Sequence, residues 1–178
     1  LLKEGTVYAG HEMDRLEGYD ILIKDGSIHK IGKDLENNSG YKIDKVISIN
    51  NSLVTPGFIT PYSQLGLVEI DMIPETRDDS SSLYSAGFSI SQAFNPSSTL
   101  IPHNLNGGIT SSITMPNSRG LFRGMASFFN LSGSLDSLME KDIAMVANFT
   151  TGNESKAGNI QLMEDSIALA RDFDLSDN

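Results

Sequence analysis

The chain has 178 residues, of which 39% are hydrophobic and 20% are charged; it has no cysteine and a formal net charge of -10 at pH 7. This composition is enough for one folded domain, or for one small domain and part of another, and it excludes disulfides, thiolate metal sites and cysteine nucleophiles. The acidity argues against nucleic acid or an anionic membrane as a partner, and no apolar run reaches the roughly 18 residues of a membrane span.

The cellular location stays open. The chain begins Leu-Leu-Lys, without methionine and already within a predicted strand, and no signal peptide is visible. We therefore expect a processed or excised piece, either cytoplasmic or periplasmic and secreted after removal of an export signal.

The first 55 residues are predicted to be β-structure. Apolar and β-branched residues indicate short strands at 6–8, 19–24, 27–32, 45–49 and 53–54. Asp25-Gly26 supplies a two-residue hairpin turn, because glycine accepts a positive φ at little cost. Residues 36–40 are predicted to be a polar loop. Short strands at this spacing are typical of a small β-sandwich.

The pattern changes to longer units from Pro56 onward. We predict a polar loop at 69–82, mixed helical character at 83–93, and a helix after a serine cap near 97–98 that ends at Gly107-Gly108. Strands are predicted at 109–115, 126–131 and 143–149, with a break at 151–153. Asn159 is predicted to cap a helix with Ile160, Met163 and Ile167 on a stripe that packs against a sheet.

The segment that joins these two parts resembles a known family. Residues 53–67 read Leu-Val-Thr-Pro-Gly-Phe-Ile-Thr-Pro-Tyr-Ser-Gln-Leu-Gly-Leu. This resembles the entry to the barrel of the amidohydrolase superfamily, where the pattern is Pro-Gly-Phe-Ile-Asp-x-His-x-His and the two histidines bind a catalytic divalent metal. Here Tyr62 and Gln64 stand at the histidine positions and Thr60 at the aspartate position.

Two further segments carry the same resemblance. Residues 20–32 are similar to the hairpin of the amidohydrolase N-terminal sandwich, and residues 94–115 resemble imidazolonepropionase-like amidohydrolases. The resemblance implies an α/β protein with an all-β N-terminal part: a β-sandwich composite domain at 1–55, then the first units of a (β/α)8 TIM barrel at 56–178. Such a barrel needs about 250 residues, so it is incomplete in this chain.

The residues at the metal positions are poor ligands. In an extended strand Tyr62 and Gln64 point to the same side, but a phenol has a pKa near 10 and an amide offers one neutral oxygen. They suit hydrogen bonding across a pocket, or they are ordinary residues of the barrel interior. The histidines, His11, His29 and His103, show no HxH, HxxxH or HExxH spacing and are predicted to be surface or structural residues.

Four residues are candidates for a pocket. Glu69 belongs to an acidic run with Asp71, Glu75, Asp78 and Asp79, which as a whole is predicted to be a solvated face. Asn95 lies in the Phe-Asn-Pro segment of the resemblance. Arg119 and Arg123 follow a barrel strand and suit bidentate binding of a carboxylate or phosphate, with exposed surface charge as the alternative.

The resemblance implies a metal-dependent hydrolase that acts on C–N bonds of amides or cyclic amides, with a metal-bound hydroxide as nucleophile. No metal is expected from this segment; a divalent metal such as zinc would be held by downstream ligands in the full-length protein, and the segment alone is not a complete catalyst. The alternative is a non-catalytic homologue that binds a small molecule or pairs with an active relative. Expected partners are a small-molecule substrate or ligand, the remainder of the barrel, and a second or homologous subunit.

Overall fold

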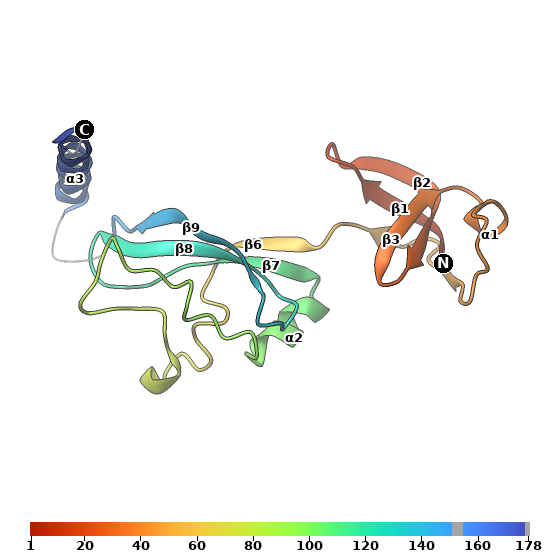
Figure 1. The fold of residues 1–178 in the computed structure, drawn as a ribbon, viewed down its shortest axis with the longest axis horizontal. Coiled ribbons are helices and arrows are strands. Elements are labelled where there is room, and N and C mark those ends of the chain that lie inside the picture. The colour runs from red at the N-terminus through yellow and green to blue at the C-terminus, as the bar shows by residue number, and fades with distance from the viewer. Residues whose placement is uncertain (151–154, 177–178) are drawn as a thin grey trace. The chain divides into compact units, whose positions relative to one another are not determined.

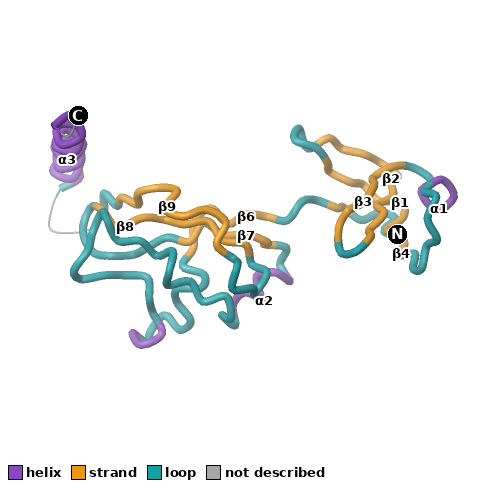
Figure 2. Tube along the Cα trace, in the orientation of Figure 1, coloured by secondary structure: helices purple, strands orange, loops and turns teal. Residues whose placement is uncertain are grey.

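In a computed structural model of the chain, the structure describes residues 1–150 and 155–176. Their regular secondary structure is mostly β-strand with few helices, and the strands form two mixed sheets (Figures 1 and 2). The chain divides into two compact units, Leu1–Pro56 and Gly57–Asn178. Within the described ranges, no helix combines the length and the apolar character needed to cross a membrane.

The first unit is built on one five-stranded sheet in the order β3-β2-β1-β4, with β5 also paired to β1. β2 is antiparallel to β1 and β3, whereas β4 and β5 run parallel to β1. The predicted Asp25-Gly26 turn is confirmed, because both residues have positive φ, 52° and 76°, and Lys24 pairs with Ser27 across it. The strands are β1 (Leu2–Ala9), β2 (Asp14–Lys24), β3 (Ser27–Gly32), β4 (Ile47–Ser48) and β5 (Leu53–Val54).

The second layer of the predicted β-sandwich is not formed by residues 1–56. β4 and β5 are two residues long and both align beside β1, so they extend one sheet and do not start another. The predicted polar loop at 36–40 also differs, because a short helix, α1 (Leu35–Asn38), begins there. The buried carboxylate of Asp20 accepts the backbone N–H groups of Leu35 and Glu4, each at 2.9 Å, and so holds α1 against the sheet.

The second unit contains a four-stranded sheet in the order β6-β7-β8-β9. β6 and β7 are parallel and are joined by a long connection that includes the short helices η1 (Pro74–Thr76) and α2 (Leu100–Asn106). β7, β8 and β9 are successively antiparallel. The strands are β6 (Phe58–Ser63), β7 (Ile109–Thr114), β8 (Phe122–Asn130) and β9 (Leu138–Ala147).

The sequence predicts only the first units of a TIM barrel, and the strands of the described residues form open sheets without a closed barrel. The strands predicted at 126–131 and 143–149 exist as β8 and β9, but they form an antiparallel hairpin. The connection at 131–137 is far shorter than the dozen or more residues that a parallel crossover needs. A β–α–β connection therefore occurs at β6–α2–β7 and is not repeated at β8 and β9.

The helix predictions have mixed outcomes. The helix after Ser98 is confirmed as α2, whose first backbone N–H, that of Leu100, is 3.3 Å from the Ser98 hydroxyl. Residues 83–93 contain no helix; Ser81 Oγ accepts the N–H groups of Leu83 and Tyr84, a local turn that competes with helix formation.

The C-terminal helix prediction is confirmed in part. α3 (Lys156–Ser176) exists, but Asn159 lies inside its first turn and its side chain donates to the Phe149 carbonyl. Ile160 and Ile167 are 52% and 46% exposed, so the predicted packing of that stripe on a sheet is wrong. The predicted break at 151–153 lies outside the described residues.

Two apolar clusters fix the long connection against the sheet of the second unit. Leu67, Val68 and Ile90 pack on Phe129 of β8, and the Phe94 ring stacks on the Phe129 ring at a centroid distance of 4.0 Å. A second cluster unites Leu65, Ile101 and Leu131. Figure 1 shows α2 and the connection from β6 on one side of this sheet. Burial of a large apolar side chain contributes about 1.5–3 kcal/mol, so both clusters anchor the chain as it leaves β6.

Candidate functional site

The end of β6 is held to β7 by backbone and hydroxyl contacts. Ser63 pairs with Thr114, and the Ser63 carbonyl accepts the N–H of Met115 at 2.9 Å. The hydroxyl oxygens of Ser63 and Ser112 are 2.6 Å apart, and Thr114 Oγ1 donates to the Leu65 carbonyl at 3.1 Å. The register shifts between Thr60 and Ser63, which interrupts the strict alternation that the sequence predicts for this strand.

The side chain that follows this strand is bound to a buried carboxylate. Gln64 Nε2 donates to Asp79 Oδ2 at 2.5 Å, and Asp79 is 1% exposed. Arg77 binds the same carboxylate with two nitrogens, Nη2 at 2.9 Å from Oδ2 and Nε at 3.3 Å from Oδ1. A buried carboxylate needs such partners, and a guanidinium fork is the cation best shaped to supply them.

Arg77 links the buried carboxylate to a second one at the surface. Its Nη1 lies 2.5 Å from Asp71 Oδ1 and 2.9 Å from the Asp71 carbonyl oxygen. The hydrogen bond to Asp79 and the charge of Asp79 raise the pKa of the Arg77 guanidinium above its ordinary value, with Asp71 adding to the effect. Arg77 therefore stays charged, and we name the set Gln64, Asp79, Arg77 and Asp71 the polar chain.

The two positions of the metal-binding pattern do not fit a divalent cation. Tyr62 is 68% exposed, while the Gln64 amide is committed to Asp79. Zinc prefers neutral imidazole, thiolate or carboxylate ligands, and neither residue provides one. Within the described ranges, no group of three or more His, Cys, Asp or Glu side chains is arranged to hold a metal ion.

A hollow of about 360 Å³ lies beside Gln64. Its polar lining is mostly neutral, with Asp71 as the charged group, and leucine and valine side chains supply an apolar wall. This mixture suits a small polar molecule held by hydrogen bonds. Tyr62 is not among its lining residues, which are Thr60, Ser63, Gln64, Leu65, Val68, Asp71, Leu100 and Asn104.

Two predicted pocket residues, Glu69 and Asn95, lie together. Asn95 Nδ2 is 3.4 Å from Glu69 Oε1, and the Asn95 backbone N–H donates to the Gly66 carbonyl at 2.7 Å. Both residues line a hollow of about 240 Å³ that also includes Glu75 and Asp78. With three carboxylates in its lining, this hollow favours a cationic or hydrogen-bond-donating group over an anion.

The two predicted arginines differ in setting. Arg119 is exposed and lines a hollow of about 710 Å³. Arg123 is partly buried, donates through Nη1 to Asn117 Oδ1, and has a buried Nε without a partner among the described residues. Asn117 lines the same hollow as Arg119, so it connects the two arginines.

The sequence does not predict the polar chain. The acidic run that includes Asp79 is predicted to be a solvated face, and this is wrong for Asp79, which is buried. The available signal was Arg77, a cation two residues before Asp79 and within a run of carboxylates. All three histidines, His11, His29 and His103, are exposed.

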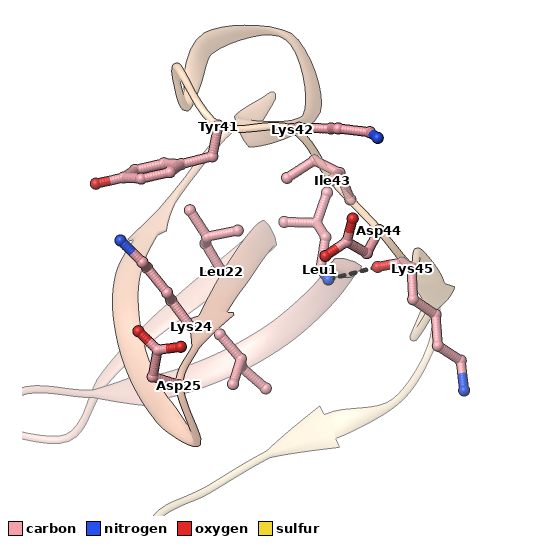
Figure 3. Close-up of a pocket in the computed structure, with 10 residues that line it drawn as sticks. Leu1, Leu22, Lys24, Asp25, Tyr41, Lys42, Ile43, Asp44 and Lys45 are labelled. Carbon is pink, nitrogen blue, oxygen red and sulfur yellow. Dashed lines mark hydrogen bonds between the residues drawn. The ribbon is translucent and has the colours of Figure 1, made fainter.

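The first unit has a hollow of its own, about 400 Å³ in volume (Figure 3). Leu22 and Ile43 contribute apolar surface, and Lys24 Nζ lies 4.8 Å from the centre of the Tyr41 ring. Figure 3 shows the Asp44 carboxylate on the opposite side from Tyr41, while Lys42 and Lys45 extend away from the centre. Asp25 and Asp44 in the same lining offset only part of the positive charge of the three lysines.

The fold is similar to that of a solved protein. No protein-family model matches the sequence, and no curated protein matches it either. The crystal structure of an amidohydrolase from Thermotoga maritima MSB8 matches with a TM-score of 0.76 and 18% sequence identity, over 98% of this chain and 48% of that chain. The likeness is one of fold. The chain spans about half the length of that protein.

Proposed function

We propose that this chain is the N-terminal part of an amidohydrolase-like protein in which the first barrel strand, β6, no longer supplies metal ligands. The fold likeness to an amidohydrolase across 98% of the chain is the observation that carries the proposal. The parallel pair β6 and β7, joined through α2, supports it as the start of a barrel. In this proposal residues 1–55 belong to the composite β-domain and the strands that complete the barrel lie outside these 178 residues.

The proposed chemistry is hydrolysis of a C–N bond in an amide or cyclic amide. Because Tyr62 and Gln64 are unsuited to a divalent cation, any metal in the full-length protein would be held by later residues such as histidine or aspartate. The contribution of the β6 end would be to bind a small molecule. Thr60, Ser63 and Gln64 present neutral polar groups to the hollow beside β6, and such groups orient a substrate without carrying a reacting charge.

A second candidate is a non-catalytic homologue that binds a small molecule or pairs with an active relative. The polar chain favours this reading, because Gln64 is fastened to Asp79 and serves to hold the loop after β6. A homologue often keeps the fold of a family after it has lost the catalytic site of its relatives.

Elemental analysis of the full-length protein, combined with assays on a panel of amides and cyclic amides, separates the two candidates. Stoichiometric zinc, manganese or iron together with turnover supports the hydrolase. Absence of both, with metal binding gained by the double variant Tyr62→His and Gln64→His, supports the non-catalytic homologue. A wild-type protein whose metal is lost on Gln64→Ala would contradict the proposal that β6 has no ligand role.

A further inference from the structure

We propose that the hollow between residues 80–85 and residues 117–119 binds the oxyanion group of a small molecule, a carboxylate or a phosphate, with Arg119 as its main ligand. This proposal concerns binding and does not rest on the proposed hydrolytic function. The hollow, of about 710 Å³, is lined by Ser80, Ser81, Ser82, Leu83, Tyr84, Ser85, Asn117 and Arg119.

The charge of this lining is the first reason. It contains one guanidinium and no carboxylate, in a chain whose formal net charge is -10. The hollows beside Gln64 and beside Glu69 both include carboxylates, Asp71 in one and Glu75 and Asp78 in the other. An anion is therefore repelled less here than at those two hollows.

The state of the two arginines is the second reason. Neither Arg119 nor Arg123 forms an ion pair with a carboxylate of the described residues. Arg119 is exposed, and its planar guanidinium can bind both oxygens of a carboxylate or phosphate. Arg123 donates to Asn117, which lines the hollow, so its positive charge also makes the electrostatic potential near the hollow more positive.

Asn117 is oriented to donate. Its Oδ1 accepts Arg123 Nη1, so the other end of the amide, Nδ2, is the group left for a ligand. Nδ2 has no partner among the described residues. An amide whose oxygen is held by a cation presents N–H groups, which an anion requires. The hydroxyl groups of Ser80, Ser82 and Ser85 add donors around the same hollow.

The two walls of the hollow are tied together before any ligand arrives. The Ser81 backbone N–H donates to Ser118 Oγ at 3.0 Å, and Ser118 is 1% exposed. The Asn117 backbone N–H donates to the Asp79 carbonyl at 2.6 Å. The carboxylate of Asp79 is paired with Arg77, which reduces its repulsion of an incoming anion. A wall fixed in this way loses little conformational entropy on binding.

The test is a titration of the isotope-labelled full chain, followed by NMR, with inorganic phosphate and with acetate in separate arms and with chloride at matched ionic strength as the baseline. We expect saturable shifts at residues 80–85 and 117–119. Arg119→Gln should weaken binding at least about tenfold, as expected for the loss of a charged hydrogen-bond donor. Arg171→Gln removes the same charge from the exposed surface of α3 and should leave the affinity within about twofold.

Asn117→Asp provides a second test that keeps the bond to Arg123 while it replaces the donor with a negative charge. We expect it to abolish binding. Saturation by phosphate alone would identify a phosphate ester as the ligand class, by acetate alone a carboxylic acid, and by both a general oxyanion site. Absence of saturable shifts with either anion, or equal losses in the Arg119→Gln and Arg171→Gln variants, would overturn the proposal.

Discussion

The side-chain amide of Gln64 lies 2.5 Å from the carboxylate of Asp79, which Arg77 holds from the other side with two nitrogens. Gln64 follows the last residue of β6, and Asp79 lies 15 residues further along the connection that leaves this strand. The resemblance of residues 53–67 implies a metal-binding histidine at the Gln64 position. Here that position closes a loop by hydrogen bonds to a buried anion.

Loss of the Asp79 carboxylate should destabilise the second unit. Asp79→Ala leaves Gln64 and Arg77 without their shared acceptor, and we expect it to lower the free energy of unfolding by about 2–3 kcal/mol. Urea denaturation of the variant gives this value. Asp78→Ala is the matched control, because its exposed side chain should change stability by less than about 0.5 kcal/mol. Equal effects of the two substitutions on the free energy of unfolding would show that the polar chain does not stabilise the second unit.

A second carboxylate beside Asp79 should make stability depend on pH. Gln64→Glu places like charges in contact, which raises the pKa of the introduced carboxyl above its unfolded value. A group whose pKa is raised on folding stabilises the fold while it is protonated and loses that contribution as pH rises. The variant should therefore approach wild-type stability near about pH 4 and fall away from it above about pH 6.

Gln161→Glu is the control for this experiment. Gln161 Nε2 also donates to an aspartate, Asp165, at 2.9 Å, but both residues are exposed on α3. Water screens that pair, so its pH dependence should be small. Thermal unfolding of both variants across pH 4 to pH 8 compares them. A Gln64→Glu profile as flat as that of Gln161→Glu would contradict the buried contact.

Gly66→Ala should be more costly than an alanine at an equally strained glycine. Gly66 has a φ of +79°, and an added Cβ would lie 2.4 Å from the Phe94 ring. The left-handed backbone costs about 1–2 kcal/mol for alanine, and overpacking adds about 1–3 kcal/mol. Gly10 has a φ of +77° and open space around it, so Gly10→Ala isolates the backbone cost. Chemical denaturation that gives the two variants the same loss of stability would show that the Phe94 ring moves aside at no energetic cost.

The stability contributed by the Lys3–Glu36 ion pair should decrease at alkaline pH. Lys3 Nζ lies 2.8 Å from Glu36 Oε2, and this hydrogen bond raises the pKa of Lys3 from its usual 10.5, with the charge of Glu36 as the next cause. A raised pKa means that the contribution is complete below pH 10.5 and is lost as pH rises through the folded value. The melting temperature of Lys3→Met should lie slightly below that of wild type at pH 7 and converge with it at alkaline pH. A difference in melting temperature that stays constant from pH 7 to alkaline pH would show that Lys3 contributes through packing of its aliphatic chain and not through its charge.

Local chemistry explains which features the sequence predicted correctly. The Asp25-Gly26 turn, the helix after Ser98 and the β-branched strand at 109–115 depend on neighbouring residues, and all three are present. The antiparallel pairing of β8 with β9 depends on a short connection that composition alone does not distinguish from the turn of a crossover. The mixed helical character predicted at 83–93 is absent, because the Ser81 hydroxyl binds the backbone at the start of this segment.

The sequence predicts the strand that leads to Gln64, but it does not predict the hydrogen bonds of the polar chain. Pro56-Gly57 and the apolar residues after it locate the strand, while the interest in Gln64 comes from the family resemblance of residues 53–67. Its partner Asp79 is separated from it by a loop, and the burial of one carboxylate among five is a tertiary property. Arg77 reaches Asp79 across only two residues, and this short-range pair was the one part of the polar chain that the sequence could have suggested.

A zinc titration of the isotope-labelled chain, observed at the side chain of Gln64 and the ring of Tyr62, tests the central claim most directly. We expect no saturable change at either residue in the wild-type chain, and a strong change at both positions in the double variant Tyr62→His and Gln64→His, because imidazole is the ligand that zinc prefers. A stoichiometric zinc-dependent shift of Gln64 and Tyr62 in the wild-type chain would contradict the account, since it would mean that the amide leaves Asp79 to bind metal.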